Sequence, residues 1–316
     1  MDLRLLHTFI AAAELENFHQ AAERLYLAQP TVTAHIRQLE QILGFQLFDR
    51  VGKRVKLTAA GRQFLPHARR VLAAYDEAIN EMTAWWQGYD TRLQLVTSPL
   101  VATSVLPGLL KRFTQEHPHV EVVITTEVSP AVGQVVASGA AHVGLARSPS
   151  SHPDTSSTVL YTDPVVLVAS PANGTGASWV DLVGRHLLLT GNHPIYWDAL
   201  LMAVSERQPH LRTLAVDRVD ITKRLLEEGL GVSFLPLSSV VRELAAGRLV
   251  TVPVDIDLPL SATYLILPQP RQLPEAARLF VELLQQSFPD GKGPGLPPSA
   301  RGADSGEGSG EDRNGA

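Results

Sequence analysis

One long stretch with heptad spacing constrains the fold of this chain more than any other feature. Between Ala59 and about Trp86 no glycine follows Gly61, and apolar residues recur four and three positions apart. Such spacing predicts a long helix that pairs with a second helix, and its own copy in a dimer is the favoured partner. Packing against the core of the same chain is the alternative. The seam consists of Phe64, Ala68, Val71, Tyr75, Ala78, Met82 and Trp85.

The segment before this helix reads as three short helices followed by a hairpin. Apolar residues repeat at helical spacing within residues 3–44, and Asn17 is a good N-cap for the second helix. Only residues 26–29 separate the second and third helices, and Pro30 falls in the first turn of the third, where its missing N–H is harmless. Two helices joined so closely cross steeply, as in a helix-turn-helix. Short apolar pairs around residues 51–54 predict a small hairpin, or wing.

The third helix has an outward face suited to reading DNA. Its buried side is defined by Val32, Ile36, Leu39 and Leu43, so the other side chains point away from the core. Amide, hydroxyl and guanidinium groups read base edges and grip phosphates in a major groove, although any surface helix also has a solvated polar face. The outward and flanking residues are Gln29, Pro30, Thr31, Thr33, Ala34, Arg37, Gln38 and Gln41.

Charge is unevenly spread along the chain. Residues 1–70 carry ten Lys and Arg against six Asp and Glu, whereas the whole chain has a net charge of −5. A basic end on an acidic body suits a protein that presents that end to a polyanion such as DNA.

Beyond Gly88, strand-like and helical runs alternate, which predicts a parallel-sheet α/β architecture. Ligands bind such sheets at the carboxyl ends of the strands, so the loops after Val96, Thr126, Ala146 and Leu189 are the expected site. The tail over 289–316 is rich in Gly, Pro, Ser and charge, and it is predicted to be disordered. The expected strands cover 93–96, 120–125, 143–146, 165–169, 186–189 and 232–235, and the expected helices cover 106–116, 130–138, 197–206 and 221–228.

Several classes of protein are excluded by what the sequence lacks. The chain has no cysteine, which rules out disulfides and thiolate chemistry. It has no apolar run near the roughly 20 residues of a membrane span, and acidic residues near the N-terminus argue against a signal peptide. No GxSxG, phosphate-loop or HExxH motif is present. We therefore expect a cytoplasmic protein without a membrane partner that is not an enzyme and needs no metal or other cofactor.

A spaced set of residues in the N-terminal segment resembles the LysR-type transcriptional regulators across their whole DNA-binding domain. The resemblance continues to about Phe288, through Ser98-Pro99 and residues 228–236. Within the family, TGNHPIYWD over 190–198 and ITKRLLEEGLGVSFLP over 221–236 are similar to the regulators of citrate synthase genes. The set consists of FHQAAERL over 18–25, QPTVT over 29–33, Ile36, Leu39, Glu40, Leu43, Gly44, Leu47, Phe48, Arg50, Leu57, Thr58 and Gly61.

The resemblance implies an α+β multidomain fold. It places a winged helix-turn-helix at 1–58, a linker and dimerisation helix at 59–88, and a two-lobed α/β effector domain, like that of periplasmic binding proteins, at 89–288. The lobes would cover 89–161 plus 265–288, and 162–264. The implied partners are operator DNA, a small-molecule effector, expected to be a carboxylate, a second copy through the linker helix, a homotetramer and RNA polymerase. The alternative is a two-lobed small-molecule-binding protein without regulatory DNA binding.

The resemblance also assigns residues to the two functions. His142 stands where the family usually has aspartate, and we expect it to be structural and not a metal ligand. Arg147 is of most interest, as a lone cation that would select a charged ligand. DNA contacts are expected from Gln29, Pro30, Thr31, Thr33, Ala34 and Arg37 on the third helix and from Arg50, Lys53 and Arg54 in or beside the wing. Effector contacts are expected from Ser98, Leu100, Thr103, Ser104, Ser129 and Arg147 on one lobe and from Thr190, Asn192, His193 and Tyr196 on the other.

Overall fold

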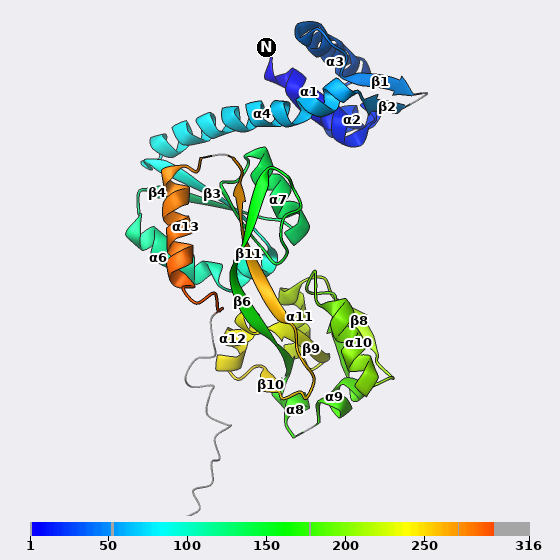
Figure 1. Cartoon of the computed structure of the whole chain (residues 1–316), viewed down its shortest axis with the longest axis vertical. Helices are drawn as coiled ribbons and strands as arrows, with labels where there is room; N and C mark the ends of the chain where they lie inside the picture. Colours follow the sequence, from blue (N-terminus) through cyan, green and yellow to red (C-terminus); the bar gives the residue numbers. More distant parts are fainter. Residues whose placement is uncertain (1, 52–53, 177, 271, 294–316) are drawn as a thin grey trace, which may run out of the picture.

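The computed structural model describes residues 2–293 apart from 52–53, 177 and 271. Figure 1 shows an N-terminal head at one end, a long helix leading away from it, and two lobes below that helix. Among the described residues, no helix combines the length and the apolar character that a bilayer span requires.

The head has the three helices and the hairpin that the sequence predicts. Asn17 caps the second helix by accepting hydrogen bonds from the N–H groups of His19 and Gln20. The head core includes Phe9 and Phe48, whose rings meet edge to face with centroids 5.7 Å apart. Its elements are α1 (Leu3–Leu15), α2 (Phe18–Arg24), α3 (Gln29–Leu43), β1 (Phe48–Val51) and β2 (Arg54–Leu57).

The long helix α4 (Ala59–Trp86) divides its apolar seam between two environments. Its first half packs into the head core, where Phe64 is partly buried and Ala68 is fully buried. Its second half leaves large apolar side chains exposed, including Tyr75, Met82 and Trp85. Packing within the chain, the alternative to a partner helix, therefore accounts for the first half of the seam only.

Helix α4 also touches the first lobe. His142 Nε2 lies 3.7 Å from the carboxylate of Glu77 on α4, and His142 Nδ1 accepts a hydrogen bond from the N–H of Gln94. His142 therefore joins the helix to the lobe, as its expected structural role requires.

The two lobes share one mixed sheet (Figure 1). The strand order is β4-β3-β5-β11-β6-β9-β7-β8, with β10 added beside β6. Lobe I contains β3 (Thr91–Thr97), β4 (Val120–Thr126), β5 (Val143–Ala146), α5 (Pro99–Thr103), α6 (Leu106–Glu116), α7 (Ser129–Ser138) and α13 (Glu275–Ser287). Lobe II contains β7 (Leu187–Thr190), β8 (Thr213–Ala215), β9 (Gly231–Pro236), β10 (Val250–Val252), α8 (Pro171–Gly174), α9 (Trp179–Arg185), α10 (Trp197–Arg207), α11 (Val219–Glu227) and α12 (Leu237–Ala245).

Two long antiparallel strands, β6 (Thr155–Ala169) and β11 (Leu260–Pro268), run from one lobe to the other. The predicted parallel sheet is therefore found within each lobe but not across the whole sheet, which is mixed. The pairs β3–β4, β3–β5, β7–β8 and β7–β9 are parallel, whereas β6 and β11 pair antiparallel with each other and with their other neighbours. The first half of β6 is polar and only partly buried, since one face of an antiparallel strand can lie toward solvent. It therefore lacks the apolar run by which the other strands were predicted.

The cores of the two lobes divide β6 between them, while the lobe limits at 161/162 and 264/265 remain predictions. Tyr161 and Leu265 belong to the core of lobe I, and Val165 belongs to the core of lobe II. At the C-terminus the order extends further than the predicted limit at 288, because Thr162 and the segment 291–293 exchange backbone hydrogen bonds of 2.7–2.8 Å. The rest of the tail predicted to be disordered, 294–316, lies outside the described residues.

Candidate functional site

The predicted reading face of α3 is exposed in the structure. Gln29, Pro30, Ala34 and Arg37 are exposed, because the opposite side of α3 is buried in the head core. Thr31 and Thr33 lie at the edge of this face and are half-buried. The outward orientation is confirmed, and contact of these residues with bases remains a prediction.

The wing is held against α3 by a buried contact. Glu40 Oε1 on α3 accepts hydrogen bonds from the N–H groups of Leu47 and Phe48, at 2.8 and 3.2 Å, which fixes the start of β1. Arg50 lies in β1 and Arg54 in β2, so two of the predicted basic residues belong to the hairpin. Lys53, the third, lies outside the described residues.

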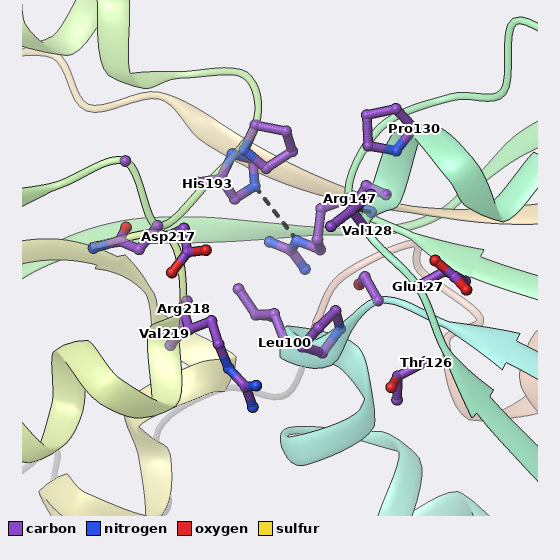
Figure 2. Close-up of a pocket in the computed structure, with 16 residues that line it drawn as sticks. Leu100, Thr126, Glu127, Val128, Pro130, Arg147, His193, Asp217, Arg218 and Val219 are labelled. Carbon is purple, nitrogen blue, oxygen red and sulfur yellow. Dashed lines mark hydrogen bonds between the residues drawn. The ribbon is translucent and has the colours of Figure 1, made fainter. Parts of the chain in front are cut away.

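A cavity of about 390 Å³ lies between the two lobes. Six of the predicted effector residues line it: Ser98, Leu100, Ser129 and Arg147 from lobe I and Asn192 and His193 from lobe II. Figure 2 shows Leu100, Val128 and Pro130 facing Asp217, Arg218 and Val219 across this interlobe cleft. Open sheets bind ligands at strand ends, and the lining loops follow β3, β4, β5, β7 and β8.

Four predicted residues do not reach the cleft. Thr103 is the last residue of the short helix α5 and Ser104 is its C-cap; both donate to carbonyl groups of α5, and neither lines the cavity. Tyr196 is buried behind His193 and donates to the carbonyl of Phe234. Thr190 is buried at the end of β7 and is likewise not part of the lining.

Arg147 is not the lone cation that the sequence suggested. Its guanidinium is 1% exposed, donates to Ser261 and Thr263 on β11, and lies 4.0 Å from the carboxylate of Asp163 on β6. Asp163 in turn accepts hydrogen bonds from the N–H and hydroxyl of Ser238, while burial raises the pKa of its carboxyl. The positive charge of Arg147 is therefore neutralised inside the protein by groups on the crossing strands β6 and β11.

His193 joins this cluster from lobe II as a neutral ring. Its Nε2 lies 3.5 Å from Arg147 Nε and 2.7 Å from the hydroxyl of Ser261. Burial, with a further contribution from the positive charge of Arg147, lowers the pKa of His193 to about 3. The imidazole of His193 therefore supplies no positive charge to the cleft at neutral pH.

The side chain of Asn192 lines the cleft, but its hydrogen bonds go to residues of lobe II. Its side-chain amide donates to Ser233 and Thr222, and its carbonyl accepts from the indole of Trp197 at 3.1 Å. These bonds fix the loop that carries His193 at the wall of the cleft.

Besides the buried cluster, the polar groups that border the cleft include Ser98, two helix starts and the half-exposed side chain of Arg218, which pairs with Asp220 at 3.0 Å. Ser98 is 2% exposed, and its hydroxyl has no hydrogen-bond partner among the described residues. The starts of α7 and α11 also line the cavity, and neither has a side-chain cap. Helix starts present unpaired N–H groups and a partial positive charge.

Sequence reasoning missed a large part of the lining. The segment before α11 was overlooked because β8 is only three residues long and fully exposed. Asp217 and Arg218 stand just before the strongly amphipathic helix α11, and this pattern could have indicated that the segment lines the cleft. Within the described chain, no group of three or more potential metal ligands is found. The missed residues include Thr126, Glu127, Val128, Asp217, Arg218 and Val219.

Known proteins match both parts of the chain. Residues 3–62 match the family described as "Bacterial regulatory helix-turn-helix protein, lysR family", and residues 87–289 match "LysR substrate binding domain". The transcriptional regulator CitR of Bacillus subtilis is 43% identical over 84% of this chain and 93% of its own length. The transcriptional activator HcaR of Escherichia coli is 27% identical over 90% of this chain and 98% of its own length.

A solved structure shows this fold on DNA. Full-length CbnR in complex with its target DNA superposes with a TM-score of 0.58 at 25% identity, over 91% of this chain and all of that one. Together with the family matches, these relatives favour regulation over the alternative of a binding protein without DNA binding. The chain belongs to the LysR family of transcriptional regulators, which bind DNA through the helix-turn-helix head, carry a ligand-binding domain and are not enzymes.

Proposed function

We propose that this regulator responds to a small organic anion, a di- or tricarboxylate, bound in the interlobe cleft. The observation that carries the proposal is that Ser98, whose buried hydroxyl has no partner among the described residues, lines a cavity bordered by two uncapped helix starts. Hydroxyl and free N–H groups bind carboxylate oxygens well.

A ligand with several carboxylates fits this distribution of donors. The start of α7 belongs to lobe I and the start of α11 to lobe II, so two carboxylates on one molecule would hold the lobes together. Glu127 and Asp217 also line the cleft and oppose a larger anion that would reach them. A ligand shifts a conformational equilibrium only by its differential affinity for the two states. A ligand that bridges both lobes would bind a closed arrangement of the lobes more tightly than an open one. Its binding could thereby alter how the protein binds DNA.

Calorimetry on the full chain tests this proposal with citrate and succinate, and with glucose as the neutral comparison. Ser98→Ala is expected to weaken binding of the carboxylates about three- to tenfold, because one hydrogen bond is lost. Val128→Trp is expected to abolish binding, because Val128 is 64% exposed at the cleft and the larger ring fills it.

Ser170→Ala is the matched control. Ser170 is also buried and precedes a helix, and its hydroxyl likewise has no partner in the described part of the chain, but it lies outside the cleft. Binding of glucose in place of the carboxylates, or equal losses for Ser98→Ala and Ser170→Ala, would contradict the proposal.

We infer in addition that α4 pairs with its copy in a homodimer that acts on DNA in the cytoplasm. Tyr75, Ile79, Met82 and Trp85 are each about half exposed or more along one stretch of this helix. Large exposed apolar surfaces on helices mark association sites. A tetramer of such dimers and contact with RNA polymerase remain predictions from the resemblance.

The double variant Met82→Glu, Trp85→Glu is expected to weaken the dimer about a hundredfold or more, since burial of each side chain contributes about 1.5–3 kcal/mol. Sedimentation equilibrium measures the dissociation constant of the dimer. Thr83→Glu is the control, because it adds a charge to the same turn of α4 but lies outside the seam. An unchanged dimer in the double variant would place the interface elsewhere.

A further inference from the structure

A second cavity, of about 320 Å³, lies between the lobes at a different place from the cleft. We call it the crevice, and it is formed by α6 and the end of α13 from lobe I and by α12 from lobe II (Figure 1). The short helix α5 separates the two cavities, because Ser98 before its start lines the cleft and Ser104 after its end lines the crevice. No lining residue is common to both.

Two arginines from opposite lobes line the crevice. Arg112 on α6 is half exposed, donates to the hydroxyl of Ser287 at 3.3 Å, and lies 4.0 Å from the carboxylate of Glu116. Arg242 on α12 is exposed, and in the described part of the chain no ion pair or hydrogen bond occupies its guanidinium. Neither arginine is buried in an ion-pair cluster as Arg147 is, so both guanidinium groups can reach an anion in the crevice.

The walls between the arginines are apolar. Leu109 on α6, Val241 on α12 and Phe288 after α13 all line the crevice. Small-molecule sites typically combine such walls with a few polar groups that fix the orientation of the ligand. Gly108 widens the space, because a Cβ built at this position meets no heavy atom within 4 Å.

We propose that the crevice is a second ligand site, which takes a small organic anion with an apolar body. The carboxylate would lie between Arg112 and Arg242 and bridge the two lobes, while the apolar body would pack on Leu109 and Phe288. A charge-assisted hydrogen bond to a guanidinium is about twice as strong as a neutral one. The proposal of this site does not rest on the carboxylate proposed for the cleft.

The crevice is also connected to the cleft through the buried cluster. Ser238 lines the crevice and donates to Asp163, and Asp163 lies 4.0 Å from Arg147, which lines the cleft. A ligand that holds α12 against α6 therefore acts on the same crossing strands as a ligand in the cleft. Occupation of one site is expected to change affinity at the other, and such coupling is reciprocal.

Calorimetry of the full chain with hexanoate tests the site, with hexanamide as the neutral counterpart. Hexanoate is expected to bind and hexanamide to bind at least about tenfold more weakly, because the charged bonds to the arginines are lost. Arg112→Gln and Arg242→Gln should each weaken hexanoate about tenfold or more, and Lys111→Gln, an exposed neighbour on α6 outside the crevice, should not.

Two blocking variants separate the crevice from the cleft. Gly108→Leu fills the crevice with a better helix former and should abolish hexanoate binding while citrate binding stays. Val128→Trp fills the cleft and should leave hexanoate binding in place.

Loss of hexanoate binding in Val128→Trp but not in Gly108→Leu would overturn the proposal, because the ligand would then occupy the cleft. Absence of hexanoate binding by the unaltered chain, or equal binding of hexanamide, would overturn it as well. If Gly108→Leu fails to fold, the two arginine variants decide, since Arg112 is half exposed, Arg242 is exposed, and their replacement leaves the core intact.

Discussion

Asp163→Ala is expected to cost about 3–5 kcal/mol of unfolding free energy, because it leaves the guanidinium of Arg147 buried without a carboxylate. The two groups are 0% and 1% exposed, so water cannot replace the lost partner. The hydroxyl of Ser238 would lose its acceptor in the same variant. Urea unfolding of the full chain, followed by the signal of the effector domain, measures the loss.

Two further variants show whether the cost comes from the uncompensated charge. Asp163→Leu combined with Arg147→Met removes both charges and should recover most of the loss, as apolar replacements of buried ion pairs often do. Glu116→Ala breaks an exposed pair with Arg112 and should cost no more than about 1 kcal/mol. A single Asp163→Ala variant as stable as the unaltered chain would mean that Arg147 needs no partner.

The second large effect is a loss of stability in acid, which we expect from His193. The pKa of His193 is about 3 in the folded chain against 6.5 for a free histidine, so between these values the unfolded chain holds one more proton than the folded chain. Stability from this group is fully present above pH 6.5 and is lost as the pH falls towards 3, by up to about 1.4 kcal/mol for each pH unit. Protonation of His193 would bury a positive charge and place it beside that of Arg147, which explains why the folded state resists it.

His193→Gln is expected to flatten the dependence of stability on pH in this window while His210→Gln, at an exposed position, leaves it unchanged. The measurement is the unfolding free energy at a series of pH values from about 7 down to about 4. An equal slope in the His193→Gln variant and the unaltered chain would show that other groups carry the acid sensitivity.

The parts of the fold that follow local rules could be predicted from the sequence. Asn17 as a cap, Pro30 in a first helical turn and the apolar stripe of α3 each depend on a few neighbouring residues, and the structure places all three as expected. The pairing of β6 with β11 depends on residues about a hundred positions apart, and no local pattern specifies its antiparallel direction.

The candidate site divides in the same way. Ser98 and Ser129 lie shortly after strand ends, at the starts of α5 and α7, and their place in the cleft follows from that position. The role of Arg147 could not be predicted, because its partners Asp163, Ser261 and Thr263 come from the two crossing strands, and only the folded chain brings them together. The resemblance assigned Ser104 to the cleft, whereas in the structure it follows α5 and lines the crevice.

The two crossing strands make lobe II an insertion within lobe I. The chain leaves lobe I along β6 and returns along β11, and Thr162 lies directly opposite Ala262 in their antiparallel register. A two-residue hairpin turn joining Thr162 to Ala262 would therefore excise lobe II as a single cassette. Arg147, which would lose Asp163 with the cassette, would have to become apolar. Head, linker helix and lobe I would remain one continuous chain, onto which a lobe II with different ligand contacts could be grafted.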